Sequence, residues 1–387
     1  MRIGMFINYY IPSKGGMETS VINLSKGLQE AGHEVFIFCP NYPDWEEKEK
    51  NVFRYKSFFF RYDGYLYAIP VPPLSKMEDV VRSLNLDIIH SHQPFSLGWE
   101  ATKFGSKLNI PVVLTYHIKY TDYYHYVMLV PKKISQKIIR YIVNRNCRKC
   151  DAVIAPSGAI KQLLFDDGIK KSVYVIPSGI DIDQFAKDAG RRTELRGKYG
   201  VKENEVLLVT ASRVVPEKNI DFLVRAFAII RKMRKDAKLM IVGEGSFRDE
   251  LEALVKELQL EDCVIFTGLL DKEGMIAHYQ AGDIFVFASL TETQGLVAVE
   301  AMAAGLPVVA VKASGIEDMI KSGQDGILTD NTEDNFAANT VRLIEDGKLR
   351  NKMSASARIN AREFCIAPWV NKIVALYKDL IRKKKEG

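Results

Sequence analysis

Short apolar runs rich in β-branched residues alternate along the chain with longer segments in which apolar residues recur every three or four positions. This alternation is typical of parallel β-sheets whose strands are connected by helices. The pattern therefore predicts an α/β protein with two doubly wound, Rossmann-like units in tandem. Strands are expected in the first half at residues 2–8, 34–39, 87–90, 111–116, 151–155 and 173–176, and in the second half at residues 205–210, 238–242, 263–266, 283–287, 307–311 and 326–328.

A turn-forming stretch, Pro-Ser-Gly-Ile-Asp-Ile-Asp at residues 177–183, separates the two groups of strands, and we place a domain boundary after residue 180. Because ligands of open α/β sheets bind beyond the carboxyl ends of the strands, two such domains facing each other predict an interdomain cleft. Asp181 and Asp183 could share a divalent cation, but their place in the linker favours a turn or helix-capping role. A last amphipathic helix is expected at residues 368–385.

The composition is that of a compact globular protein, since 47% of the 387 residues are hydrophobic and 26% are charged. The sequence has no uninterrupted apolar run of about 18 residues and does not begin with a secretory signal pattern. Its five Cys are scattered, which favours reduced thiols in the cytoplasm. Cys147 and Cys150 form a CxxC pair, but no second pair of ligands lies nearby to complete a zinc site.

Positive charge is concentrated in the first half of the chain. Residues 1–180 contain 23 Lys and Arg against 16 Asp and Glu, whereas the remainder contains 31 against 32. An anionic partner is therefore expected on the first half. No recognition-helix or RNA-binding motif accompanies the charge, so nucleic acid is not an expected partner.

The helix expected at residues 132–149 carries much of this charge, with Ile134, Ile138 and Ile142 along one side. Such a helix can lie on anionic lipid, although a core helix with a solvated basic face is the alternative. A second candidate for lipid contact is the stretch 53–67, which combines eight aromatic residues with three basic ones.

Two glycine-containing loops follow expected strands and could approach a phosphate closely. Gly15 and Gly16 precede a helix whose first N–H groups could bind an anion, although a tight turn without ligand fits equally well. Gly243-Glu244-Gly245 has Arg248 where a dinucleotide-binding motif needs a third glycine, so a nicotinamide-dependent dehydrogenase is disfavoured. The sequence contains no P-loop motif, so the P-loop hydrolase mechanisms lose support.

Two pairs of charged residues follow strands of the second half. Arg213 and Lys218 would lie beside a helix N-terminus, where they could neutralise a leaving diphosphate without a metal; solvated surface charges are the alternative. Glu292 is expected in a loop and Glu300 inside an apolar helix at residues 296–304. A carboxylate buried there needs hydrogen-bond donors, which sugar hydroxyls or a salt bridge could supply.

The combination of these motifs resembles the retaining family 4 glycosyltransferases of GT-B fold, over essentially the whole chain. The resemblance implies a first Rossmann-like domain that binds the acceptor and faces the membrane, and a second that binds a nucleotide-sugar donor. It also implies that the final helix crosses back to the first domain, so that the domains comprise residues 1–180 with 368–387, and residues 181–367. The motifs that carry it are Glu292 with Glu300, Arg213 with Lys218, Gly15-Gly16 and the Pro-Ser-Gly-Ile-Asp linker.

The resemblance also implies a role for each matching residue. Arg213 and Lys218 would hold the diphosphate, Glu292 the hydroxyls of the donor hexose, and Glu300 the ribose. His117 matches the active-site histidine near the transferred sugar, so the catalytic set would be His117, Arg213, Lys218 and Glu292. No cofactor or metal is implied. The other donor contacts would come from Gly15, Gly16, Gly243, Leu270, Gln294, Gly295 and Leu296.

Residues 115–127 resemble the corresponding region of bacterial diacylglycerol glucosyltransferases, which implies a lipid acceptor. We therefore expect a peripheral enzyme at the inner face of the cell membrane that moves a hexose, glucose from UDP-glucose, to a lipid hydroxyl such as that of diacylglycerol. The alternatives are a related transferase with a soluble or polysaccharide acceptor, a nucleotide-sugar isomerase, and a non-catalytic sugar-nucleotide binding protein. The expected acceptor or membrane contacts are Tyr123, Tyr124, Lys132, Lys133, Lys137 and Arg140.

Overall fold

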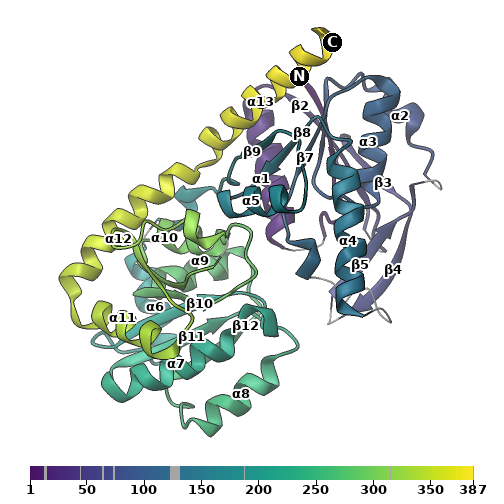
Figure 1. The fold of residues 1–387 in the computed structure, drawn as a ribbon. Coiled ribbons are helices and arrows are strands. Elements are labelled where there is room, and N and C mark those ends of the chain that lie inside the picture. The colour runs from purple at the N-terminus through teal and green to yellow at the C-terminus, as the bar shows by residue number, and fades with distance from the viewer. Residues whose placement is uncertain are drawn as a thin grey trace. The chain divides into compact units, whose positions relative to one another are not determined.

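A computed structural model describes residues 1–12, 15–43, 45–62, 65–72, 75–122, 131–186, 188–313 and 315–386 of the chain. The chain folds into two compact units (Figure 1). The first comprises Met1–Gly179 with Ile366–Gly387, and the second comprises Ile180–Cys365.

In the described part of the first unit, a seven-stranded parallel sheet has the order β3-β2-β1-β6-β7-β8-β9. The strands are β1 (Arg2–Phe6), β2 (Glu34–Pro40), β3 (Val52–Tyr55), β6 (Ile88–Ser91), β7 (Val112–Thr115), β8 (Ala152–Ala155) and β9 (Val173–Val175). The helices are α1 (Gly16–Glu30), α2 (Glu78–Ser83), α3 (Leu97–Leu108), α4 (Lys132–Cys147), α5 (Gly158–Asp166) and α13 (Ile366–Glu386).

Both faces of this sheet are buried, as expected for a parallel sheet covered by helices. On β1, Ile3 and Met5 belong to one apolar cluster with residues of α1 and α13, while Phe6 points to the opposite cluster with residues of α3 and α4. Gly27 of α1 lets α13 pack closely, since a Cβ there would lie 2.6 Å from Ile366 Cγ2. Cys147 and Cys150 are fully buried in the core, so the CxxC pair belongs to the packing of this unit.

The described part of the second unit contains a six-stranded parallel sheet in the order β12-β11-β10-β13-β14-β15. The strands are β10 (Val206–Ala211), β11 (Ala237–Val242), β12 (Val264–Gly268), β13 (Ile284–Phe287), β14 (Val308–Val311) and β15 (Gly326–Thr329). The helices are α6 (Ala189–Lys198), α7 (Ile220–Met233), α8 (Arg248–Glu257), α9 (Lys272–Ala281), α10 (Leu296–Ala303), α11 (Glu333–Glu345) and α12 (Gly347–Ala361).

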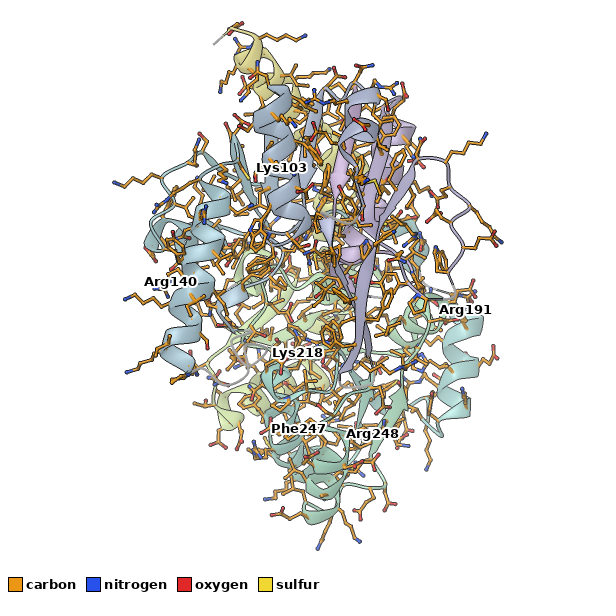
Figure 2. The ribbon with its side chains drawn as sticks, turned by 90° about the vertical axis from the view of Figure 1, so that its right-hand side faces the viewer. Lys103, Arg140, Arg191, Lys218, Phe247 and Arg248 are labelled. Atoms are coloured by element: carbon orange, nitrogen blue, oxygen red, sulfur yellow. The ribbon has the colours of Figure 1, made fainter. Side chains whose placement is uncertain are left out.

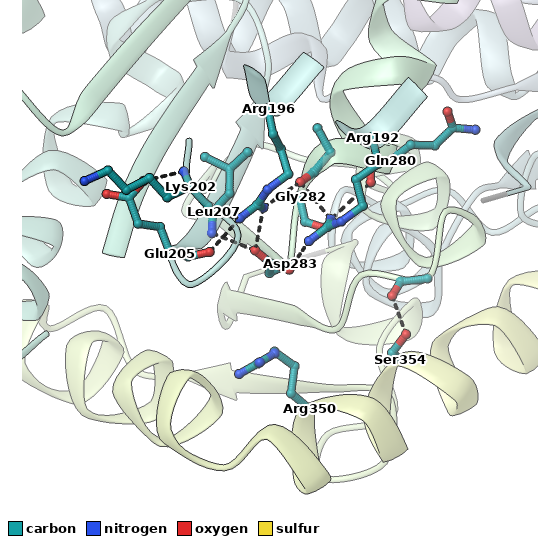
Figure 3. A network of polar contacts seen from close by, with 12 residues as sticks. Arg192, Arg196, Lys202, Glu205, Leu207, Gln280, Gly282, Asp283, Arg350 and Ser354 are labelled. Carbon is teal, nitrogen blue, oxygen red and sulfur yellow. Dashed lines mark hydrogen bonds and ion pairs between the residues drawn. The ribbon is translucent and has the colours of Figure 1, made fainter. Parts of the chain in front are cut away.

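The amino ends of the central strands in this unit are tied to α6 by a charged network (Figure 3). The two carboxylate oxygens of Asp283 accept hydrogen bonds from Arg192 (2.7 Å) and Arg196 (3.0 Å), and the backbone N–H of Leu207 donates to the same carboxylate (2.8 Å). Arg196 is 2% exposed and also donates to the carbonyl oxygens of Lys202 and Glu205. Since each of these partners belongs to the protein, the network holds the fold together at this edge.

The α/β fold expected from the sequence is confirmed. Each of the twelve expected strands is present with ends that differ by at most two residues, and the last expected helix is α13. Three further strands were not predicted: β3, and the antiparallel hairpin formed by β4 (Ser57–Tyr62) and β5 (Tyr65–Pro70). In the linker, Asp181 precedes a short 3-10 helix, Ile182–Phe185, and accepts a hydrogen bond from the side chain of Gln184. Among the described helices, none combines the length and the apolar character needed to cross a bilayer.

Candidate functional site

The carboxyl ends of the strands carry the candidate residues in both units. In the first unit, β1 leads to α1, and Gly15 occupies the position just before the helix. A Cβ on Gly15 would lie 2.7 Å from Oε2 of Glu18, so the glycine allows that carboxylate to approach. A Cβ on Gly16 would meet no atom within 4 Å, so the start of α1 is sterically open there.

His117 follows β7 at the same edge of the sheet. Its Nε2 lies 3.0 Å from Nδ1 of His92, which follows the adjacent strand β6. Burial lowers the pKa of His117 to about 4, so the ring is neutral near pH 7. His117 is predicted from the sequence, but His92 is not, although His90 and His92 alternate at the end of an apolar strand.

The basic residues expected to contact the membrane lie on α4 and are exposed: Lys132, Lys133, Lys137 and Arg140. Arg140 projects outward from the helix (Figure 2) and also forms an ion pair with Asp167. Tyr123 and Tyr124, the other two expected contacts, lie outside the described residues.

The apolar residues of α4 face two ways. Ile139 and Val143 are buried in the core, whereas Ile134, Ile138 and Tyr141 are 52%, 44% and 66% exposed. A depression of about 260 Å³ continues this outer face and is lined by Trp99, Tyr141, Ile142, Arg145, Asn146 and Lys149. Apolar and basic side chains therefore share one outer surface.

The β4–β5 hairpin is a second apolar surface of this unit, and it contains the aromatic stretch noted in the sequence. Cross-strand pairing places Phe58 opposite Ile69 and Phe60 opposite Tyr67, so these four residues lie on one face. Phe58, Ile69 and Phe60 are 68%, 50% and 43% exposed. Tyr67 also makes an edge contact with Tyr9, which follows β1, so the hairpin lies at the carboxyl edge of the sheet.

In the second unit, Lys218 and Glu292 come together from loops that follow the neighbouring strands β10 and β13. Nζ of Lys218 donates a hydrogen bond to Oε1 of Glu292 at 2.6 Å, and both side chains are less than 20% exposed. Burial alone would raise the pKa of Glu292, but the charge and hydrogen bond of Lys218 lower it below its usual value. Arg213, on the same loop as Lys218, lies 3.4 Å from Glu217.

Glu300 lies inside α10 and is held differently. Its Oε2 accepts a hydrogen bond of 3.0 Å from the hydroxyl of Tyr279, which comes from α9. Burial raises the pKa of Glu300 to about 7, against the smaller opposing effect of that hydrogen bond. The carboxyl group is therefore about half protonated near neutral pH. Tyr279 was not identified from the sequence, because the pairing joins two helices that are separate in the chain.

The other expected donor contacts surround this edge. Gly243 adopts a φ of 133°, and a Cβ there would lie 1.9 Å from the carbonyl oxygen of Ser212, so the loops after β10 and β11 pack backbone against backbone. Gly243 N donates to Gly268 O, which brings in the loop after β12 that also contains Leu270. Gly295 has a φ of 83° and precedes α10, between buried Gln294 and half-buried Leu296.

Comparison with known proteins identifies the family. Residues 14–184 match the sequence profile described as Glycosyltransferase Family 4, and residues 191–360 match the profile described as Glycosyl transferases group 1. The chain is 34% identical over 343 residues to the alpha-monoglucosyldiacylglycerol synthase of Streptococcus pneumoniae, a match that covers 85% of this chain and 75% of that protein. This chain belongs to the family 4 glycosyltransferases.

Further relatives of this glycosyltransferase differ in their acceptors, as their names state. It is 28% identical to the alpha-monoglucosyldiacylglycerol synthase of Acholeplasma laidlawii over 100% of this chain and 99% of that protein. It is 30% identical to the N-acetyl-alpha-D-glucosaminyl L-malate synthase of Bacillus anthracis over the full length of both.

Solved structures extend the comparison to the fold of the glycosyltransferase. Sucrose-phosphate synthase from Thermosynechococcus elongatus aligns with a TM-score of 0.82 and 23% identity over 99% of both chains. Anabaena Alr3699/HepE, solved in complex with UDP-glucose, aligns with a TM-score of 0.78 and 21% identity over 98% of this chain and 100% of that one. The GT-B fold expected from the sequence is confirmed.

Proposed function

We propose that this glycosyltransferase transfers a glucosyl group from UDP-glucose to the hydroxyl of diacylglycerol, at the inner face of the cell membrane and with retention of anomeric configuration. The observation that carries the lipid acceptor is the outer face of α4. A core helix explains buried Ile139 and Val143, but it does not explain exposed Ile134, Ile138 and Tyr141 among basic side chains. The names of the Streptococcus pneumoniae and Acholeplasma laidlawii relatives support the same acceptor.

The donor assignment is supported by the grouping of charges at the carboxyl edge of the second unit. Glu300 can accept hydrogen bonds from the two ribose hydroxyls once it is ionised, and Glu292 can accept them from the hexose. Arg213 and Lys218 supply positive charge for the diphosphate, with the helix N-terminus at Gly295 close in sequence to Glu292. UDP-glucose as the donor is supported by the Anabaena complex, which shares the fold.

The proposed reaction needs no cofactor or metal. The bond between C1 of glucose and the β-phosphate oxygen breaks as the bond between C1 and the acceptor oxygen forms. The acceptor proton passes to a phosphate oxygen of the departing UDP. Arg213 and Lys218 stabilise the charge that develops on the diphosphate, and the family resemblance assigns His117 to the transferred sugar. Retention follows from the family resemblance.

The first test is transfer itself. Purified enzyme is incubated with UDP- and GDP-sugars and with vesicles that contain diacylglycerol and anionic phospholipid, and nucleotide release and glycolipid formation are measured. We expect UDP release and glucosyldiacylglycerol formation with UDP-glucose. Release that requires a soluble acceptor such as malate, and not lipid, would favour the second candidate function, which the full-length match to the Bacillus anthracis enzyme supports.

The membrane surface is tested by matched charge changes on two exposed helices. Lys133→Gln with Lys137→Gln alters α4, and Lys348→Gln with Lys352→Gln makes the same change on exposed positions of α12. Because each basic residue at an anionic surface contributes about 1 kcal/mol, the α4 pair should weaken vesicle binding about thirtyfold and the α12 pair should leave it unchanged. Equal effects of the two pairs, or no binding to anionic vesicles at low salt, would contradict the lipid surface.

A further inference from the structure

Three histidine rings stack one after another at the carboxyl ends of β6 and β7. His90 stacks on His92 with ring centroids 4.1 Å apart, and His92 stacks on His117 with centroids 5.3 Å apart. His90 and His92 are 0% and 1% exposed. His90 and His92 are therefore fully buried, and His92 is the ring that separates His90 from His117.

The two buried rings differ in how their nitrogen atoms are satisfied. Nδ1 of His90 lies 2.5 Å from the hydroxyl of Tyr377 in α13, and its Nε2 lies 2.7 Å from the hydroxyl of Thr115 in β7. Nδ1 of His92 lies 3.0 Å from Nε2 of His117, whereas Nε2 of His92 has no partner among the described residues. His90 is thus held by the protein core, and His92 pairs with the candidate active-site ring.

The pairing constrains which nitrogen carries each proton. Both rings are neutral, because burial lowers the pKa of His117 to about 4 and that of His92 well below its usual value. A neutral ring carries one N–H, so one ring must donate and the other accept. If His117 donated, the proton of His92 would lie on Nε2, where it would be a buried N–H with no acceptor among the described residues. A buried donor without a partner is less favourable than a buried acceptor without one.

We propose that His92 is a positioning residue, which donates from Nδ1 to Nε2 of His117 and so keeps the His117 proton on Nδ1 and the ring in a fixed orientation. This inference rests on the proposed function, because that function gives His117 its role as the active-site histidine. The nitrogen that carries the proton decides whether His117 presents a donor or an acceptor to a ligand. His92 therefore determines which hydrogen bond the active-site ring can make, without touching substrate itself.

Histidine tautomers give a direct test. In enzyme labelled with nitrogen-15 at its six histidines, the signals of His117 are assigned with a His117→Ala variant. We expect Nδ1 of His117 to carry the proton in the wild type. In His92→Leu, which removes the donor, the proton of His117 should move toward Nε2. In His92→Asn, whose amide N–H can replace Nδ1–H, the wild-type pattern should return.

Kinetics supply the second readout. His92→Leu should lower kcat about tenfold and change KM for UDP-glucose less than threefold, since a misplaced group acts on the transition state more than on donor binding. His92→Asn should restore kcat to within threefold of the wild type. His90→Asn is the matched control, because it changes the adjacent buried ring but leaves the pair between His92 and His117 intact. It should reduce stability and leave the His117 tautomer and kcat near those of the wild type.

The outcomes separate this inference from the proposed function. An unchanged His117 tautomer in His92→Leu, or a loss in His92→Asn equal to that in His92→Leu, overturns the positioning role. A change in KM alone overturns it as well. If the wild type transfers no sugar to any acceptor, the proposed function fails, while the nitrogen signals still decide whether His92 holds His117.

Discussion

The two ends of the sheet in the second unit both hold partly buried charges, but they satisfy them to different degrees. At the amino end, the Asp283 carboxylate binds two guanidinium groups and a backbone N–H. At the carboxyl end, Glu300 accepts a hydrogen bond from Tyr279 and has a pKa raised to about 7 by burial. Removing one partner of a fully bonded buried charge destabilises the fold, whereas a carboxylate whose pKa is raised by burial keeps capacity for a ligand. The comparison separates structural charge from functional charge within one sheet.

The largest effect is expected at the amino end. Asp283→Asn removes the countercharge of Arg196, whose side chain is almost fully buried. Leaving a buried charge uncompensated costs about 3 kcal/mol or more, so the urea midpoint of the second unit should fall strongly. Affinity for UDP-glucose, measured by calorimetry on the folded fraction, should stay within threefold of the wild type. Stable protein with weak donor binding would reverse the assignment of the two ends.

Lys218→Ala should have the opposite profile. Loss of the cation proposed to stabilise the departing diphosphate should lower kcat by about 10²-fold. The urea midpoint should fall less than in Asp283→Asn, because the Glu292 carboxyl can take up a proton once Lys218 is removed. The pKa of Glu292 should rise, because Lys218 is the main group that lowers it. Lys348→Ala on exposed α12 is the matched control and should retain full activity. Normal turnover in Lys218→Ala would remove Lys218 from the catalytic set.

The raised pKa of Glu300 predicts that donor binding becomes stronger as pH rises. In the proposed donor site, ribose hydroxyls would donate to the ionised carboxylate, so affinity should increase as pH rises through about 7. With that pKa, UDP-glucose should bind about tenfold more weakly at pH 6 than at pH 8. Glu300→Gln should bind weakly at both pH values. A wild-type affinity that is flat between pH 6 and 8 would contradict the assignment.

The same carboxyl group should limit stability. Because burial makes the pKa of Glu300 higher in the folded protein than in the unfolded chain, the folded protein binds this proton more tightly. The resulting stabilisation is fully present below the unfolded-state pKa and is lost as pH rises through about 7. Glu300→Gln should therefore be more stable than the wild type at pH 8, by about 3 kcal/mol, and should differ from it by less than about 1 kcal/mol at pH 5. Urea titrations at the two pH values measure the difference. Destabilisation at pH 8 would place Glu300 with Asp283 as a structural charge.

Tyr279→Phe should give the smallest effect. It removes the hydroxyl that donates to Glu300 and keeps the buried ring. The pKa of Glu300 should rise further, so donor affinity at pH 7 should fall about threefold and recover at pH 8.5. An equal loss at both pH values would show that the hydroxyl acts through the position of α9 rather than through the ionisation of Glu300.

The sequence predicts the two central sheets well because each strand is a short apolar run bounded by turns. It does not predict β3 or the β4–β5 hairpin, where Phe53, Arg54 and Tyr55 mix aromatic and basic residues without a clear alternation. Within the site, it identifies residues that belong to local motifs, such as Glu292 and Glu300. It misses Tyr279 and His92, since their contacts are made across elements that tertiary packing alone brings together.

The crossing of α13 to the first unit has a consequence for how the chain matures during synthesis. Ile3 and Met5 of β1 belong to the same apolar cluster as Trp369 and Tyr377 near the other end of the chain. That side of the first unit's core therefore stays incomplete until α13 has been synthesised, even though the strands of its sheet are translated earlier. Residues 366–386 must leave the ribosome before this enzyme has a complete first unit, so a product truncated ahead of α13 would carry an exposed apolar face for the quality-control machinery of the cell to bind.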